Sequence, residues 1–282
     1  MAEREDIMTY REVIALGEKI LTMAGIADVK TDAWMLLEMV AKIDRNFYYM
    51  HMNDEIIQEQ LEEYKSVLKK RAEHIPLQYI TGETEFMGLP FKVNSKVLIP
   101  RQDTETLVEE ALKLAKPGMK VLDMCTGSGC IIISILHHSR ELEGYASDIS
   151  KHAINVAKEN AKLTRVEVSF GTGDLFDNIK GKYDIIVSNP PYIRTEDIAK
   201  LMPEVQNFEP FNALDGKEDG LFFYRRIVEQ AGDYLNPGGH LLFEIGHDQG
   251  EDVSELMRQA GFKEVRVIKD LAGNDRVVTG GL

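Results

Sequence analysis

The stretch Val121-Leu122-Asp123-Met124-Cys125-Thr126-Gly127-Ser128-Gly129 decides the fold. It begins with apolar residues typical of a short buried strand, and its two glycines then allow a tight turn. An apolar segment over residues 131–137 predicts that a helix follows. A strand, a glycine turn and a helix in this order indicate an α/β sheet, in which ligands bind at the carboxyl ends of the strands.

The same alternation continues on both sides of this stretch. A helix is expected before it, over residues 107–115. After it, strands are expected over 144–148, 166–170, 183–187, 239–245, 265–269 and 277–279, and helices over 150–163, 221–235 and 249–260. This order predicts a doubly wound, mostly parallel sheet. The last two strands have no long helix between them, so we expect an antiparallel strand at the sheet edge.

The N-terminal part of the chain has a different pattern. Apolar residues recur at helical spacing over residues 8–72, which predicts a small helical bundle. From residue 76 to 99, Gly82, Gly88 and Pro90 interrupt short β-rich pieces. The predicted organisation is therefore a helical domain over 1–75, a β-hairpin linker over 76–100 and an α/β domain over 101–282.

Composition narrows the classes of function. The net charge is −14, from 33 basic and 47 acidic residues, which disfavours a long nucleic acid as a stable partner. The two cysteines, Cys125 and Cys130, allow neither a disulfide framework nor a zinc site, and the histidines show no metal-ligand spacing. Residues 1–6 are charged and lack a signal-peptide core, and no apolar run is long enough to span a membrane. We expect a soluble cytoplasmic protein without a metal.

Three features converge at the carboxyl ends of the predicted strands. The first is the glycine loop with its preceding acid: Asp123, Cys125, Thr126, Gly127, Ser128 and Gly129. The second is Asp148 with Ile149, where a carboxylate can accept two ribose hydroxyls. The third is Asp174, Leu175 and Phe176, where an acid and a ring can hold a purine. Each feature alone is compatible with an ordinary turn, whereas their order along the chain favours a nucleoside cofactor.

The nature of the cofactor follows from what the glycine loop lacks. A dinucleotide fingerprint needs a third small residue, and Ile132 occupies that place. The lysine of a phosphate-binding P-loop is also absent from this loop. A nucleoside without a pyrophosphate fits better, and S-adenosylmethionine is the common one.

The second chemical motif is Asn189-Pro190-Pro191-Tyr192, directly after an expected buried strand. The two prolines fix φ and remove two backbone N–H donors. They leave a rigid turn that carries an asparagine amide, carbonyl oxygens and an aromatic ring. Such a turn can accept the hydrogens of a planar amino or amide group. With a methyl donor nearby, the motif predicts N-methylation of such a group.

The chain resembles the glutamine-N5 methyltransferases that modify peptide chain release factors, from about Ile75 to Gly280. The resemblance rests on Pro76–Gly82, Val97–Arg101, Thr104-Glu105, Asp123–Gly129, Asn189–Ile193, Phe208–Pro210, Glu244–Gly246 and Asp275–Val278. The motif Asn189–Tyr192 alone is shared with adenine-N6 DNA methyltransferases. Two departures are Gln102-Asp103, where relatives usually have Pro-Glu, and Cys125, where many have Gly.

The resemblance implies a class I methyltransferase fold, S-adenosylmethionine as cofactor and the glutamine of a Gly-Gly-Gln motif as acceptor. It implies that Asn189 and Pro190 grip the acceptor amide while Tyr192 shapes the pocket. Pro191 is also expected to contact the substrate, and Asn189 is also expected to contact the cofactor. Arg101 and Glu105 are expected to line the cofactor site, although a plain salt bridge between them is the alternative. Glu244 is expected to be structural.

The expected partner is therefore a release factor. The helical domain is expected to bind it as the substrate-recognition element, and the enzyme is expected to be a monomer. Alternative acceptors are a ribosomal-protein glutamine and an exocyclic amino group of DNA or RNA. The latter requires base flipping and a basic groove that the chain does not obviously supply. A binding module with an inactive cofactor site is a further alternative, which the intact set of motif residues disfavours.

Overall fold

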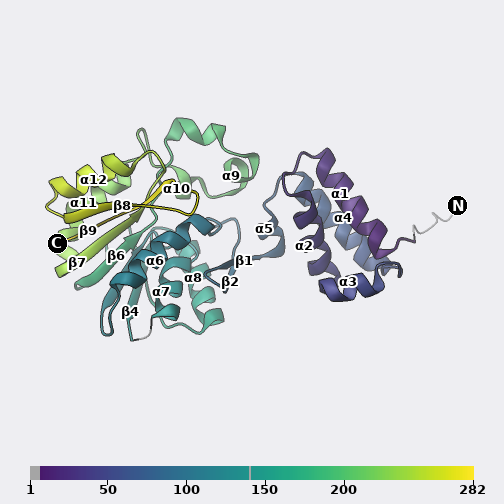
Figure 1. The fold of residues 1–282 in the computed structure, drawn as a ribbon, viewed down its shortest axis with the longest axis horizontal. Helices are drawn as coiled ribbons and strands as arrows, with labels where there is room; N and C mark the ends of the chain where they lie inside the picture. The colour runs from purple at the N-terminus through teal and green to yellow at the C-terminus, as the bar shows by residue number, and fades with distance from the viewer. Residues whose placement is uncertain (1–6, 140) are drawn as a thin grey trace. The chain divides into compact units, whose positions relative to one another are not determined.

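A computed structural model describes residues 7–139 and 141–282. The residues up to Gly82, together with Pro203–Phe208, form one compact unit, and Glu83–Met202 with Glu209–Leu282 form the second (Figure 1). This division differs from the predicted linker over residues 76–100. Its first part is helical and belongs to the first unit, whereas its hairpin belongs to the second. Residues 1–6, whose charge disfavours a signal peptide, lie outside the described residues.

The first unit is the predicted helical bundle. Its helices are α1 (Tyr10–Met23), α2 (Val29–Ala41), α3 (Arg45–His51), α4 (Gln58–Ala72), α5 (Leu77–Thr81) and α9 (Pro203–Phe208). A capping box between Thr9 and Glu12 starts α1. Gly17 leaves room for the buried Tyr64, whose hydroxyl donates to the Ala33 carbonyl at 2.9 Å. The lack of a Cβ at Gly17 therefore lets α1 approach α4 closely.

The second unit contains the sheet. Its seven strands are β3 (Lys120–Met124), β4 (Glu143–Asp148), β5 (Ser169–Thr172), β6 (Tyr183–Ser188), β7 (Leu235–Glu244), β8 (Lys263–Lys269) and β9 (Asp275–Gly281). Their order is β5-β4-β3-β6-β7-β9-β8. The first five run parallel, and β9 is antiparallel to both β7 and β8. This confirms the predicted doubly wound sheet with an antiparallel edge.

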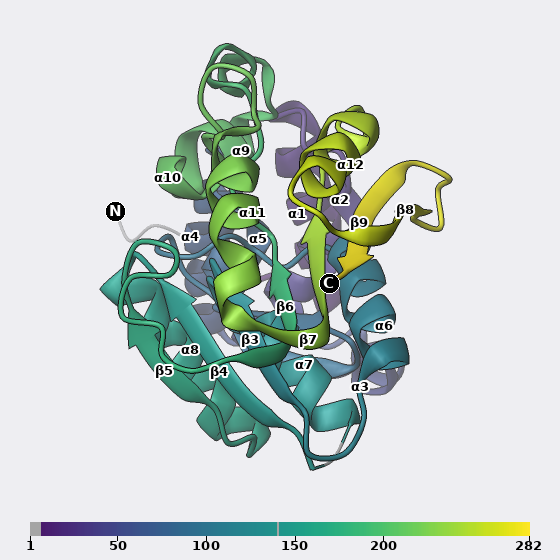
Figure 2. The ribbon, with the colours of Figure 1, turned by 90° about the vertical axis from the view of Figure 1, so that its left-hand side faces the viewer.

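Helices cover both faces of this sheet (Figure 2). One face carries α6 (Glu105–Leu114), α7 (Cys130–His138) and α8 (Lys151–Thr164), and the other carries α11 (Phe222–Tyr234) and α12 (Gly250–Gln259). Successive strand residues point to opposite faces, so Val121 packs with α6 and α7 while Leu122 packs with α11. The central strands therefore contain continuous apolar runs, Val121-Leu122 in β3 and Ile185-Ile186-Val187 in β6, as expected for strands covered on both faces.

Three local differences from the sequence prediction have physical causes. The third strand begins at Ser169 because the Val166 N–H instead donates to the Ala161 carbonyl and closes the end of α8. The last of the β-rich pieces before residue 100, Val97-Leu98-Ile99, forms no strand, since Asn94 makes a turn that accepts from the backbone N–H groups of Lys96 and Val97. The expected hairpin is shorter than its linker, with β1 (Glu83–Phe86) paired to β2 (Leu89–Lys92).

The connection after the second motif contains short helices that the apolar pattern did not predict. They are η2 (Thr195–Lys200), α9 and α10 (Phe211–Leu214), and a further short helix, η1 (Gln102–Thr104), precedes α6. Helices of three to six residues are too short to show a periodic pattern. Within the described ranges 7–139 and 141–282, no helix has the length and apolar character that crossing a membrane requires.

Candidate active site

A cavity of about 310 Å³ opens where β3, β4 and β6 end. Its lining brings together all three cofactor features and the second motif, which are far apart in the sequence. The candidate residues that line it are Arg101, Cys125, Thr126, Gly127, Ser128, Asp148, Ile149, Asp174, Leu175, Asn189 and Pro191. The candidates outside the lining are Asp123, Gly129, Glu105, Phe176, Pro190 and Tyr192.

Two further segments line the cavity and were not predicted as site residues. They are residues 96–98 with Pro100, before η1, and residues 210–213 in and before α10. The available signal was their overlap with Val97–Arg101 and Phe208–Pro210, both pieces of the family resemblance. Neither segment carries a chemical pattern that identifies it as a site by itself.

Asp148 is held at the end of β4 by the neighbouring backbone. Its Oδ2 accepts from the Gly127 N–H at 2.9 Å and its Oδ1 from the Ser150 N–H at 2.8 Å. Burial raises the pKa of this carboxyl, while the two N–H donors favour its charged form. Each oxygen keeps a second lone pair, so the carboxylate can accept the two hydroxyls of a ribose.

The two loop glycines serve different purposes. Gly127 has φ +55°, lines the cavity, and has no atom within 4 Å of the place where a Cβ would stand. Gly129 also has a positive φ, but a Cβ there would lie 3.0 Å from the Cβ of Ala157 in α8. Gly127 thus leaves the ligand side open, whereas Gly129 permits close packing of the loop on a helix.

The backbone at Cys125 has the conformation that suits the Gly found at this position in many relatives. Its φ is +61°, in the left-handed region that glycine adopts without strain. The side chain lines the cavity, and burial raises the pKa of the thiol. The thiol is therefore protonated at neutral pH, and a protonated thiol is a weak nucleophile toward a methyl donor.

Asp123 does not reach the cavity. It is fully buried at the end of β3, and its Oδ2 accepts from the Thr126 hydroxyl at 2.6 Å. Burial raises the pKa of this carboxyl to about 7. Asp123 therefore shapes the glycine loop from behind, which differs from the direct cofactor contact that the sequence suggested.

The third cofactor feature is divided in the same way. Asp174 lines the cavity, and Arg226 of α11 donates to both of its oxygens, at 3.1 and 2.9 Å. Phe176 instead stacks on Tyr234 with ring centroids 4.4 Å apart and is buried in the core. Asp174 is therefore placed to meet the purine of a nucleoside cofactor, while the Phe176 ring stabilises the turn.

The end of β6 is anchored to the glycine loop. The buried Ser188 hydroxyl donates to the Met124 carbonyl at 2.8 Å. Asn189 and Pro191 then line the cavity on either side of the buried Pro190. Tyr192 is half-buried, and burial raises the pKa of its hydroxyl. The asparagine amide thus stands at the same cavity as the cofactor loops.

Glu244 lies beside Asn189. Ser188 pairs with Phe243 across β6 and β7, so the next residues, Asn189 and Glu244, leave neighbouring strands together. The Glu244 side chain is buried, and its pKa is raised to about 7 by burial, against the opposing effect of hydrogen bonding from Thr104 and Asn189. The sequence suggested only a structural role for Glu244, whereas its position makes it the partner of the Asn189 amide.

Arg101 and Glu105 do not pair with each other. Arg101 donates to the buried Glu209 carboxylate at 2.5 Å, and Glu105 accepts from the Met87 N–H at 2.8 Å. The alternative of a plain loop–helix salt bridge between them is therefore wrong. Arg101 stays at the cavity, and Glu105 tethers the β1–β2 hairpin.

The residues present fit S-adenosylmethionine. The Asp148 oxygens suit the ribose, the open backbone at Gly127 allows close approach, and Asp174 offers an acceptor for a base amino group. Within the described part of the chain, no group of three or more His, Cys, Asp or Glu is arranged to hold a metal ion. The fold and the cavity define the nucleoside-binding domain of a class I methyltransferase.

Comparisons with known proteins agree with this class and narrow it. Residues 12–82 match the family model "PrmC N-terminal domain", and residues 102–206 match "Methyltransferase small domain". A release factor glutamine methyltransferase of Clostridium acetobutylicum is 44% identical over 98% of this chain and 100% of its own length. One of Geobacter sulfurreducens is 40% identical over 99% of each chain.

Among solved structures, a methyltransferase of Pyrococcus furiosus aligns with a TM-score of 0.53, covering 69% of this chain and 89% of its own, at 18% identity. That likeness supports the fold alone. The near full-length sequence relatives show more: the chain belongs to the release factor glutamine methyltransferase family. It is an S-adenosylmethionine-dependent methyltransferase.

Proposed function

We infer that this protein transfers the methyl group of S-adenosylmethionine to the side-chain amide nitrogen of the glutamine in the Gly-Gly-Gln motif of peptide chain release factors. Its family membership supports this reaction, since the full-length relatives carry that name. The structural observation that carries it is the position of Asn189 on the same cavity as Gly127 and Asp148. An amide acceptor and a nucleoside donor would therefore meet at one place.

The chain's own residues hold the donor. Asp148 would accept the ribose hydroxyls, Asp174 would accept from the base amino group, and the Gly127 backbone would lie against the ligand. When bound, S-adenosylmethionine supplies an electrophilic methyl group on a sulfonium. The protein then has to orient the acceptor nitrogen, and orientation alone can supply several kcal/mol of the barrier reduction.

Asn189 and Pro190 provide the acceptor grip in this proposal. The Asn189 Oδ1 and the Pro190 carbonyl each accept one hydrogen of the glutamine NH2 group. The two bonds align the nitrogen and favour the positive charge that develops on it. A glutamate side chain cannot donate two such hydrogens, and each buried acceptor left unpaired costs about 1–3 kcal/mol. The grip thus selects an amide over a carboxylate.

The helical unit is the proposed substrate-recognition element. Helix α3 has no fully buried residue, and its Tyr49 and Met50 side chains are 62% and 74% exposed. Large exposed apolar side chains gathered on one short helix can form part of a protein-binding surface. Changing both to Ser should raise the KM for the release factor without changing cofactor affinity, whereas Met23→Ser, at an exposed site at the end of α1, should leave both unchanged. An unaltered KM for the double variant would refute this role.

The proposal also covers the location, the oligomeric state and the partners of the enzyme. The enzyme works as a cytoplasmic monomer, without a membrane and without a stable nucleic-acid partner, in keeping with its charge of −14. Ultracentrifugation tests the oligomeric state. A sedimentation coefficient expected for a dimer would contradict it.

The decisive experiment offers methyl-labelled cofactor and enzyme to four separate acceptors: release factor, its Gly-Gly-Gln variant with Gln→Ala, ribosomal protein and nucleic acid. Label should enter the release factor and be absent from the Gln→Ala variant. Label on nucleic acid or ribosomal protein alone would replace the proposed acceptor. Asn189→Ala should abolish transfer while cofactor affinity, measured by calorimetry, stays near that of the unaltered enzyme.

A further inference from the structure

The turn that carries the acceptor grip has little backbone hydrogen bonding of its own, because Pro190 and Pro191 have no N–H to donate. Its position must therefore be set by its neighbours. Upstream, Ser188 is fixed to Met124. Downstream, the Ile193 N–H donates to the Leu214 carbonyl at 3.0 Å. Between these anchors, Glu244 at the end of β7 contacts the Asn189 side chain, and Gln249 contacts the Tyr192 backbone.

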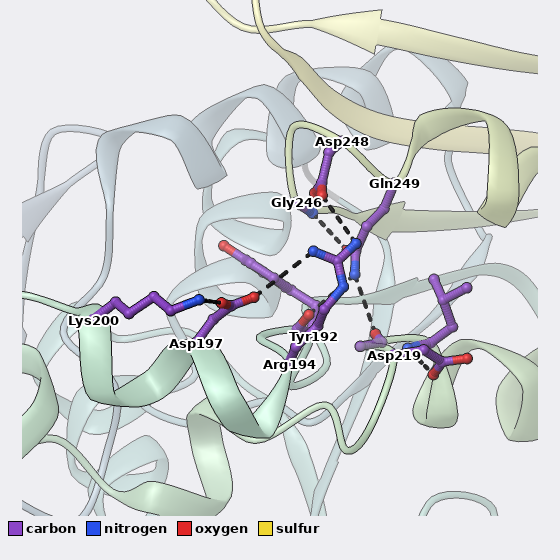
Figure 3. Close-up of polar contacts among 10 residues, drawn as sticks. Tyr192, Arg194, Asp197, Lys200, Asp219, Gly246, Asp248 and Gln249 are labelled. Atoms are coloured by element: carbon purple, nitrogen blue, oxygen red, sulfur yellow. Dashed lines mark hydrogen bonds and ion pairs between the residues drawn. The ribbon is translucent and has the colours of Figure 1, made fainter.

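Gln249 is buried at the start of α12, and both the oxygen and the nitrogen of its side-chain amide are hydrogen-bonded (Figure 3). Its Oε1 accepts from the Gly246 N–H at 2.9 Å. Its Nε2 donates to the Tyr192 carbonyl at 3.0 Å and to the Gly220 carbonyl at 3.3 Å. Because a backbone N–H can only donate, the Gly246 bond fixes which end of the amide is oxygen. The NH2 end must then face the two carbonyls.

Helix capping does not account for this side chain. Gln249 is the N-cap residue of α12, yet it makes no side-chain bond to the first turn of that helix. Its three hydrogen bonds instead join the loop after β6, the loop before α11 and the loop after β7. It therefore acts on the connections around the cavity, away from its own helix.

Two glycines close the space around the same peptide. A Cβ on Gly220 would lie 2.4 Å from the Tyr192 carbonyl oxygen and 2.6 Å from Gln249 Nε2. A Cβ on Gly216 would lie 2.7 Å from the Tyr192 backbone. The Tyr192 peptide thus lies against two chain segments that lack side chains and is tied to the Gln249 amide. A group held this closely has little freedom to shift.

We propose that Gln249 is a positioning residue for methyl transfer, which holds the Tyr192 carbonyl and through it sets the Asn189-Pro190 grip. This rests on the proposed function of that grip. Gln249 does not touch the acceptor or the cofactor. It acts by keeping the grip in line with the donor, and a shift of about 1 Å at a reacting group can cost about 100-fold in rate.

Asn160 provides a matched control at the other loop of the cavity. It is also a buried primary amide with three hydrogen bonds, donating to the carbonyls of Ser128 at 2.9 Å and Lys92 at 3.0 Å and accepting from the Lys92 N–H at 2.7 Å. It holds the glycine loop, where Gln249 holds the acceptor turn. Arg194 and Asp248 provide an exposed control, since their 3.1 Å ion pair joins the loops after β6 and β7, two of the three loops that Gln249 connects (Figure 3).

The test compares Gln249→Glu, Asn160→Asp and Asp248→Asn in the full-length enzyme at pH 8. Gln249→Glu keeps the shape and the Gly246 bond but loses both donors. It should lower kcat about 10- to 100-fold while the Kd of S-adenosylmethionine changes less than about threefold. Asn160→Asp should raise that Kd instead. Asp248→Asn should leave kcat within about twofold, because exposed ion pairs contribute little.

Equal losses of kcat and cofactor affinity in Gln249→Glu would indicate general structural damage and overturn the inference, as would an unchanged kcat. If this variant does not fold, Gln249→Met, uncharged and of similar volume, is measured in its place against the same expectations. Amide hydrogen exchange gives a readout that needs no acceptor. Exchange at Ile193 should accelerate in the Gln249 variant, and exchange at Gly127 should not. If the unaltered enzyme transfers no methyl label to a release factor, the proposed function fails. The rate of amide hydrogen exchange at Ile193 still decides whether Gln249 holds the turn.

Discussion

Replacing Asn189 by Asp tests the pairing of this side chain with Glu244. The two residues follow the paired Ser188 and Phe243 on neighbouring parallel strands. In the unaltered protein, the Asn189 NH2 group faces the Glu244 carboxylate and leaves its oxygen for the acceptor. Asn189→Asp removes that donor and sets two carboxyl groups side by side.

The cost can be worked from the strand spacing and the pKa. At the ~4.8 Å separation of neighbouring strands and an effective dielectric constant of ~20, two charges repel by about 3.5 kcal/mol. Glu244 has its pKa raised to about 7 by burial, so keeping its proton at pH 8 costs only about 1.4 kcal/mol. The variant therefore keeps a proton, and the Glu244 hydroxyl donates to the newly introduced carboxylate in place of the lost amide.

The sign follows from where the proton is bound. Glu244 has a folded pKa above its unfolded one, so the folded state binds the proton more tightly and this stability is lost as the pH rises. In Asn189→Asp the loss continues to higher pH, because the second carboxylate raises the Glu244 pKa further. Relative to the unaltered protein, the variant should be about equally stable at pH 6 and about 1.4 kcal/mol less stable at pH 8.

Urea unfolding at pH 6, 7, 8 and 9 measures this difference. The double variant Asn189→Asp, Glu244→Gln is the control, since the introduced Gln amide can donate to the introduced carboxylate at every pH. It should remove the additional pH dependence and retain more methyl transfer than Asn189→Ala. Parallel pH profiles for Asn189→Asp and the unaltered protein, or no rescue by the double variant, would refute the pairing.

Three further changes test the cofactor side of the cavity. Burial raises the pKa of Asp123 from its ordinary 3.8 to about 7, so the folded state holds a proton that the unfolded state releases, and this stability is lost as the pH rises. Asp123→Asn should therefore flatten the fall in the urea midpoint of unfolding between pH 5 and 8. An unchanged slope would show that Asp123 does not titrate in this range. Cys125→Gly removes the backbone strain of φ +61°, about 1 kcal/mol, and adds a glycine entropy cost of similar size. The melting temperature and the transfer of methyl label should therefore be nearly unchanged. A loss of transfer of about tenfold would give the thiol a role of its own. Asp148→Asn removes a charged acceptor and should raise the Kd of S-adenosylmethionine about 10- to 100-fold in calorimetry, with an unchanged Kd contradicting the ribose contact.

Much of the fold could be predicted from the sequence, because each central strand is apolar on both faces and is bounded by turn residues. The segment 183–187 and the glycine loop after Asp123 reveal their class without any tertiary contact. The short helices after Arg194 could not be predicted, since they form on packing and have no periodic pattern of their own. The division of the hairpin linker between the two units was likewise decided by packing.

The candidate site divides along the same line. Gly127, Asp148 and Asn189 could be predicted, since glycine turns and polar side chains at strand ends are local features of the chain. Their neighbours Asp123 and Gly129 have the same signature but point into the protein, one to Thr126 and the other to Ala157. A local pattern cannot distinguish a group that faces a ligand from one that faces a helix.

By itself, the sequence determined the kind of chemistry: a nucleoside methyl donor and an acceptor that presents N–H hydrogens. Those properties belong to residue types and their order, which the chain carries before it folds. Only the tertiary structure decided which groups hold the site in shape. Glu244 beside Asn189 and Gln249 on the Tyr192 carbonyl are separated from their partners by more than fifty positions of sequence, and strand register and loop packing alone bring them together.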